Sequence, residues 1–100
     1  MTQIHSAEIN DKWRKLTLNE QLGNIGSEVG RSISGRSKES AKERALELLD
    51  LTISDDRWAG PKRKEIARAR ESYLEAIDSN DAEDLNALNK YFYHFAVSAR

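Results

Sequence analysis

A glycine-rich segment contains two strings that resemble motifs of phosphate binding and nucleophilic catalysis. From Gly30, the string "GRSISGRS" follows the phosphate-binding pattern G-x-x-x-x-G-K-[ST], except that Arg36 stands where the pattern has lysine. That loop must follow a strand, whereas an amphipathic helical pattern precedes it here. In "GSEVG", Gly26 adjoins Ser27, so the spacing of a serine nucleophile elbow is missing. We therefore predict no catalytic residue in this segment.

Arg70 is the charged residue whose position most favours a binding role. On a predicted helix its angular position lies beside those of Ile66 and Ile77, where an unpaired guanidinium is costly. One interpretation is an ion pair with Glu28 or Glu47 of a neighbouring helix, or a side chain that extends along the surface to water. The other interpretation is an anion site in a polar cleft that these three residues form.

A basic string, "PKRKEIARAR", places Lys62, Arg63 and Lys64 in the first turn of a predicted helix. Cationic side chains oppose the helix dipole there, so this end could hold an anion or the phosphates of a nucleic acid. Asp55 and Asp56 precede the string and neutralise part of its charge, and no aromatic stacking platform alternates with the basic residues. We favour a solvated basic surface over a nucleic-acid interface.

His94 lies between Tyr93 and Val97, away from the main apolar face of its predicted helix, and a histidine beside tyrosines invites an acid–base proposal. No second histidine, cysteine or carboxylate accompanies it at the spacing that metal ligands need on a helix, and His5 lies in a separate N-terminal segment. We predict a surface or interface histidine, no metal site and no bound cofactor.

Bulk composition excludes several classes of function. The 100 residues suffice for one domain with a modest core, and 16 basic against 17 acidic side chains leave a formal net charge of −1. Without cysteine there are no disulfides, thiolate metal sites or cysteine nucleophiles. No run resembles a signal peptide or a membrane span. We therefore expect a cytoplasmic protein that does not enter a membrane.

Apolar residues recur at helical spacing in four segments, separated by turn residues. Thr17 and Glu20 fit a capping box before the first segment, Gly35 fits a left-handed stop after it, and Pro61 and Asp81 fit the starts of the last two. The predicted helices span about residues 18–34, 38–53, 61–78 and 82–99. We predict an all-α fold, an antiparallel up-down-up-down four-helix bundle over residues 17–100, with residues 1–16 as an N-terminal arm.

Three glycines share one flank of the first predicted helix. At about 100° per residue, Gly23, Gly26 and Gly30 lie within roughly 60° of one another, beside the apolar stripe. Each costs roughly 1 kcal/mol of helix propensity relative to alanine, so a compensating contact is expected. We predict that a helix or an aromatic ring packs against this flank.

Three apolar residues are candidates for an interface. Tyr93 and Val97 lie on a side of the fourth predicted helix that the core does not require, which favours a protein partner or a second copy of the chain. Alternatively, the arm with Ile4, Ile9 and Trp13 folds back over them. We interpret Trp13 mainly as a packing anchor and only secondarily as an interface residue.

Four blocks, "LNEQLGNIGSEVGR", "RALELLDLTISD", "KEIARARE" and "LNKYFYHFAVSAR", carry a family resemblance. They resemble the signature blocks of a group of small, uncharacterised helical proteins of prokaryotes. This resemblance implies a helical fold and no activity, cofactor or substrate. A weaker similarity to HEPN-type helical bundles, many of which are RNases, lacks the active motif because no arginine precedes His94 at the required spacing.

These observations lead to three functional hypotheses. We first expect a non-enzymatic helical bundle that acts through self-association or a protein partner. The alternatives are a nucleic-acid-associated module that uses Lys62, Arg63 and Lys64, and a small-ligand or RNA-processing protein with a polar cleft around Arg70.

Overall fold

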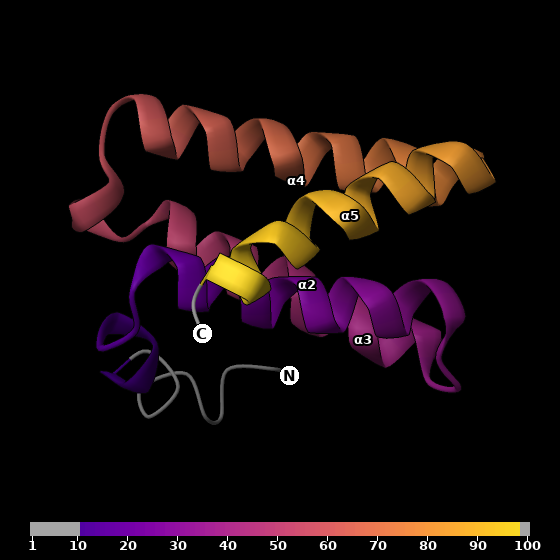
Figure 1. Ribbon diagram of the computed structural model, residues 1–100, viewed down its shortest axis with the longest axis horizontal. Coiled ribbons are helices and arrows are strands. Elements are labelled where there is room, and N and C mark those ends of the chain that lie inside the picture. The colour runs from indigo at the N-terminus through magenta and orange to yellow at the C-terminus, as the bar shows by residue number, and fades with distance from the viewer. Residues whose placement is uncertain (1–10, 99–100) are drawn as a thin grey trace.

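The computed structural model describes residues 11–98 and is all-helical there, with no strand (Figure 1). Residues 11–14 form a single helical turn. The helices that follow are α2 (Leu18–Ser34), α3 (Lys38–Ile53), the short 3₁₀ helix η1 (Asp56–Trp58), α4 (Pro61–Ser79) and α5 (Ala82–Ser98). The all-α prediction is confirmed, and the predicted helix bounds agree to within a residue; position 99 lies outside the described residues.

Local capping chemistry explains most of these bounds. The side chain of Thr17 accepts from the backbone N–H of Glu20, and Glu20 accepts in return from the N–H of Thr17, which closes the predicted capping box. Pro61 occupies the first turn of α4. Asp81 accepts from the N–H groups of Glu83 and Asp84 at the start of α5. These three start signals are confirmed.

The stop after α2 works differently from the prediction. Gly35 has φ −81° and ψ 179°, so it is extended and does not take the left-handed conformation that we expected. Its N–H donates to the carbonyl of Arg31, and an added Cβ would lie 2.5 Å from that carbonyl oxygen. Glycine is therefore needed for close backbone approach. The left-handed stop occurs instead at Asn80, after α4, with φ 56°.

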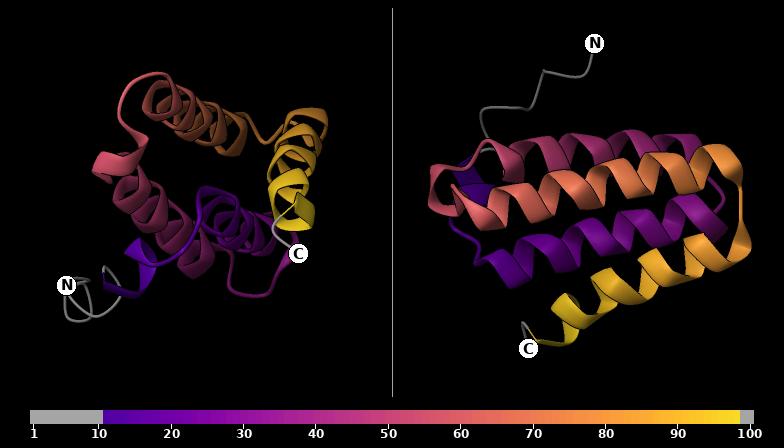
Figure 2. Two further views of the ribbon diagram at one scale, coloured as in Figure 1. Left: turned by 60° about the vertical axis from the view of Figure 1, so that its left-hand side comes forward. Right: turned by 90° about the horizontal axis from the view of Figure 1, so that it is seen from above.

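The helices pack in a ring of neighbours. α2 contacts α3 and α5, and α4 contacts the same two helices from the other side (Figure 2, left). From the end of α4, α5 runs obliquely toward α2, so its later turns lie closer to α2 than to α4 (Figure 1; Figure 2, right). Because α5 is oblique, it packs more closely against α2 than against α4.

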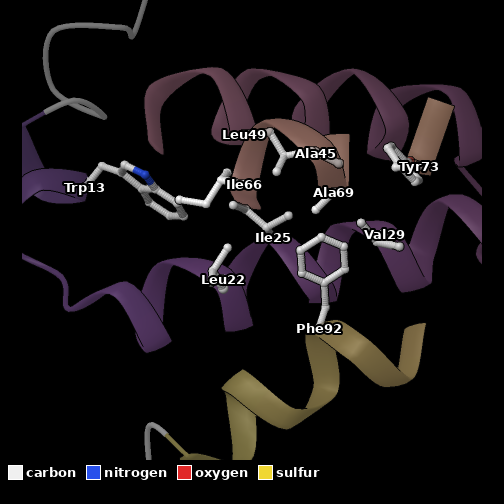
Figure 3. Packing of buried hydrophobic residues seen from close by; sticks show 10 residues of the cluster. All are labelled: Trp13, Leu22, Ile25, Val29, Ala45, Leu49, Ile66, Ala69, Tyr73 and Phe92. Atoms are coloured by element: carbon white, nitrogen blue, oxygen red, sulfur yellow. The ribbon is translucent and has the colours of Figure 1, made fainter. Parts of the chain in front are cut away.

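Side chains from every helix meet in one apolar core (Figure 3). The stripe of α2 predicted from periodicity supplies its centre, where Ile25 and Val29 are fully buried. Trp13 lies buried at one end of the core, ahead of α2. The remaining members of the cluster are Leu22 of α2, Ala45 and Leu49 of α3, Ile66, Ala69 and Tyr73 of α4, and Phe92 of α5.

Candidate functional site

The outward side of α5 exposes apolar surface. Tyr93 is 61% exposed and Val97 is 43% exposed, and both project from the same side of the helix. Asn86 and Lys90, also exposed, lie within about 60° of them at 100° per residue. We call these four residues the α5 outer face. Because α5 buries Leu85 and Phe92 elsewhere on its circumference, the core does not require the two apolar residues of this face.

A groove lies between α4 and α5. It encloses about 460 Å³, and its floor is formed by Ala69 and Ala76 of α4 together with Ala87, Leu88 and Tyr91 of α5. Three of these five residues are alanines, so side chains on the two facing helices are too short to fill the space. We call this hollow the α4–α5 groove. The space marks a departure from close packing between these two helices.

The rim of the α4–α5 groove is acidic. Glu65 and Glu75 of α4 and Asp84 of α5 line it, against a single cation, Arg68. At one end, the hydroxyl of Tyr91 donates to Glu65 across 2.9 Å. Burial, followed by the hydrogen bond to Glu65, raises the pKa of Tyr91 to about 12. Tyr91 is therefore a neutral hydrogen-bond donor at physiological pH, and its hydrogen bond to Glu65 links α5 to α4 at this end of the groove.

The three basic residues at the start of α4, Lys62, Arg63 and Lys64, make different contacts and do not form one patch. Arg63 turns toward the end of α3, where its guanidinium donates to the carbonyls of Ile53 and Asp55. Lys62 lies 5.7 Å from the centre of the Trp58 ring, and Lys64 is exposed. Arg63 thus satisfies carbonyls at a helix end, a structural role that the sequence pattern did not reveal.

Arg70 does not join the residues with which we had grouped it. Its Nε donates to Oδ1 of Asp50 at 2.9 Å, across α3 and α4. Glu28 instead lies within 3.2 Å of Arg31 and 3.4 Å of Arg44. Within residues 11–98, no ion pair links Arg70 to Glu28 or Glu47. The proposed polar cleft of these three residues is not assembled, because the acid that faces Arg70 is Asp50, one turn from the position we expected.

The glycine flank of α2 faces α5. A Cβ added to Gly26 would lie 2.6 Å from Cβ of Phe92, which is closer than any real side chain tolerates. A Cβ on Gly30 would lie 3.4 Å from the side-chain oxygen of Asn89, and Gly23 is buried. A helix of the same chain therefore packs against this flank, and its closest approach is at Gly26.

A buried polar network at the other end of α2 was not predicted. The indole of Trp13 donates to Oγ1 of Thr52 at 2.9 Å, and Gln21 donates to the carbonyl of Trp13 at 2.8 Å. The indole of Trp58 donates to Oε1 of Gln21 at 2.8 Å. Trp13 is thus a buried core residue, which agrees with its interpretation as a packing anchor; Ile4, Ile9 and His5 lie outside the described residues. The one available signal was that a buried indole requires an acceptor.

Asp55 closes the turn between α3 and α4 beside this network. Its side chain is buried, caps the N–H of Arg57 and receives the Arg57 guanidinium at 2.8–3.2 Å. The hydrogen bond from the Arg57 side chain outweighs burial and holds the pKa of Asp55 below its ordinary value. Sequence reasoning treated Asp55 only as a charge that offsets the basic string, and so missed this role.

The motif-like strings show no geometry of catalysis. Gly30 through Ser34 belong to α2, so "GRSISGRS" begins inside a helix, and Ser27 is exposed on that helix. His94 is exposed on α5. In the described part of the chain, no three histidine, cysteine or carboxylate side chains gather as a metal site would need, and no helix has the length and apolar character to span a membrane.

Comparisons with protein-family models, with curated proteins and with solved structures each found no match to this chain. The family resemblance of the four sequence blocks therefore stays a prediction, and function has to be argued from the geometry alone.

Proposed function

We propose that this chain is an antiparallel up-down-up-down four-helix bundle with no chemistry of its own, which acts by pairing with a second copy through the α5 outer face. The observation that carries the proposal is the exposure of Tyr93 and Val97 on one side of one helix. Exposed apolar side chains that share a face are typical of association surfaces, and paired surfaces of identical chains are most often related by a two-fold axis.

A two-fold arrangement suits the residues of this face. If α5 of one copy crosses α5 of the other near Tyr93, the two tyrosine rings meet at the axis, where aromatic residues contribute most to binding. Lys90 of each copy then faces the end of the partner helix that carries Val97, since the helices run in opposite directions. The two ammonium groups are thereby kept apart, and each lysine stem covers apolar surface.

The alternatives draw less support from the geometry. A nucleic-acid interface needs several free cations on one surface, whereas Arg63 is engaged with the carbonyls of Ile53 and Asp55. A ligand cleft around Arg70 needs convergent polar groups, whereas Arg70 pairs with Asp50. Self-association requires only the surface that α5 already exposes.

Mass in solution tests the proposal. We expect sedimentation velocity to show a concentration-dependent shift from 11.4 kDa toward twice that mass. Tyr93→Glu with Val97→Glu should restore the monomer, because two carboxylates per copy would be buried in the paired face. Ser40→Glu, at an exposed site in the first turn of α3, is the matched control and should leave pairing unchanged. A parent protein that stays monomeric at millimolar concentration would refute the proposal.

A further inference from the structure

We propose that the α4–α5 groove is a docking site for a basic amphipathic helix of another protein. This surface is separate from the α5 outer face, because the floor residue Leu88 and the outer residue Val97 are about 180° apart around α5. The inference therefore does not depend on self-association, and either proposal can fail without the other.

The shape of the groove fits a helix. Its lining on α4 runs from Glu65 to Ala76, a rise of about 16 Å, which corresponds to about three turns of a partner helix lying alongside. Ala69, Ala76 and Ala87 keep the floor low, so apolar side chains spaced i, i+4 and i+7 on the partner could enter between the two helices. A hollow of about 460 Å³ holds several such side chains.

The charges on the rim select the occupant. Glu65, Glu75 and Asp84 outnumber Arg68 by three to one, so the rim favours lysine and arginine on either side of the inserted apolar row. The same excess disfavours a second copy seated groove to groove, since each copy would bring the same three carboxylates. Glu65 and Glu75 are ten residues apart on α4, about 15 Å, and so place negative charge at both ends of the docked helix.

Tyr91 marks one end of the site. Its ring contacts that of Phe95 edge-on, with the centroids 5.2 Å apart, while its hydroxyl is held by Glu65. The ring is thus fixed before binding and presents a rigid apolar wall, which reduces the entropy lost when a partner docks.

A synthetic peptide provides the test. The probe is a four-turn helix with leucine at i, i+4, i+7 and i+11 and lysine at the flanking positions; a second peptide replaces every lysine by glutamate. In ¹H–¹⁵N spectra of the full chain, we expect the lysine peptide to shift amides around Ala69, Ala76 and Leu88, and the glutamate peptide to shift none. Glu75→Lys with Asp84→Lys should weaken binding by about tenfold or more.

A matched pair of alanines separates groove binding from general attraction. Ala87→Trp fills the floor from an exposed position and should weaken binding of the lysine peptide by about tenfold, whereas Ala82→Trp, exposed on the same helix outside the groove, should not. Equal binding by both variants, equal binding of the two peptides, or no binding at millimolar peptide would each overturn the inference. Groove shifts that grow with protein concentration alone would assign the site to a second copy instead.

Discussion

At the residue scale, two hydrogen bonds join buried polar side chains to tryptophan indoles, and hydrophobic periodicity does not predict either of them. Gln21 and Thr52 are fully buried, and they serve the indoles of Trp58 and Trp13 respectively. An amphipathic pattern treats glutamine as surface and threonine as neutral, so it places neither at a specific partner. Tertiary packing alone brings Trp13 to within hydrogen-bonding distance of Thr52, 39 positions later.

Replacing Gln21 should test how much this network contributes. Gln21→Leu removes the acceptor of the Trp58 indole and the donor to the Trp13 carbonyl, so we expect a loss of about 2 kcal/mol in the free energy of unfolding. Urea denaturation followed by tryptophan fluorescence measures it. Asn24→Leu, exposed on the same helix, is the control and should change stability by less than about 0.5 kcal/mol. Similar values for both variants would show that the network is not stabilising.

At the element scale, α2 is the helix that the sequence describes best. Its capping box, apolar stripe and glycine flank were all readable, because each depends on residues within one or two turns of each other. What the sequence did not show is that α5 covers the flank and that α4 and α5 consequently leave a groove. Those features depend on helix–helix distances, which Phe92 and the alanines of the floor determine together.

The glycine flank yields a prediction with opposite signs at two positions. Gly26→Ala places Cβ 2.6 Å from Cβ of Phe92, so α5 must move, and we expect a net destabilisation of about 1–3 kcal/mol. Gly30→Ala meets only the mobile side-chain oxygen of Asn89 at 3.4 Å, so the gain in helix propensity should stabilise the protein by about 0.5–1 kcal/mol. Thermal melting followed by circular dichroism measures both. Equal shifts in the same direction would contradict this account of the packing.

At the scale of the whole molecule, the sequence predicted the all-α fold and the order of the helices. Of the two candidate surfaces, it predicted the apolar residues of the α5 outer face but not the α4–α5 groove. Tyr93 and Val97 were recognised because they are apolar and off the core stripe. The α4–α5 groove was not, since alanines and acids on two helices look like ordinary positions until the helices are placed side by side. Arg70 was singled out correctly as a charge that needs a partner, but its partner is Asp50.

The stability of the whole molecule should depend on pH through Asp55. Because its folded pKa is lowered below the ordinary value of 3.8, its carboxylate stabilises the fold above that pH, and the contribution is lost as pH falls through the lowered pKa. Asp55→Asn should therefore cost about 1 kcal/mol at pH 7, a modest value because Arg57 is 40% exposed and screened by solvent. As pH falls through the lowered pKa of Asp55, the parent and the variant should converge in stability.

Denaturant titrations at a series of pH values measure this convergence. Asp56→Asn is the matched control: the neighbouring carboxylate is solvent-exposed and lies 3.7 Å from Arg63, so its removal should leave the pH profile almost unchanged. A difference between the parent and Asp55→Asn that stays constant as pH falls from about 7 through the acid range would mean that the carboxylate charge is not the source of the stabilisation. No difference at any pH would mean that Asp55 acts only through the N–H of Arg57, which asparagine also caps.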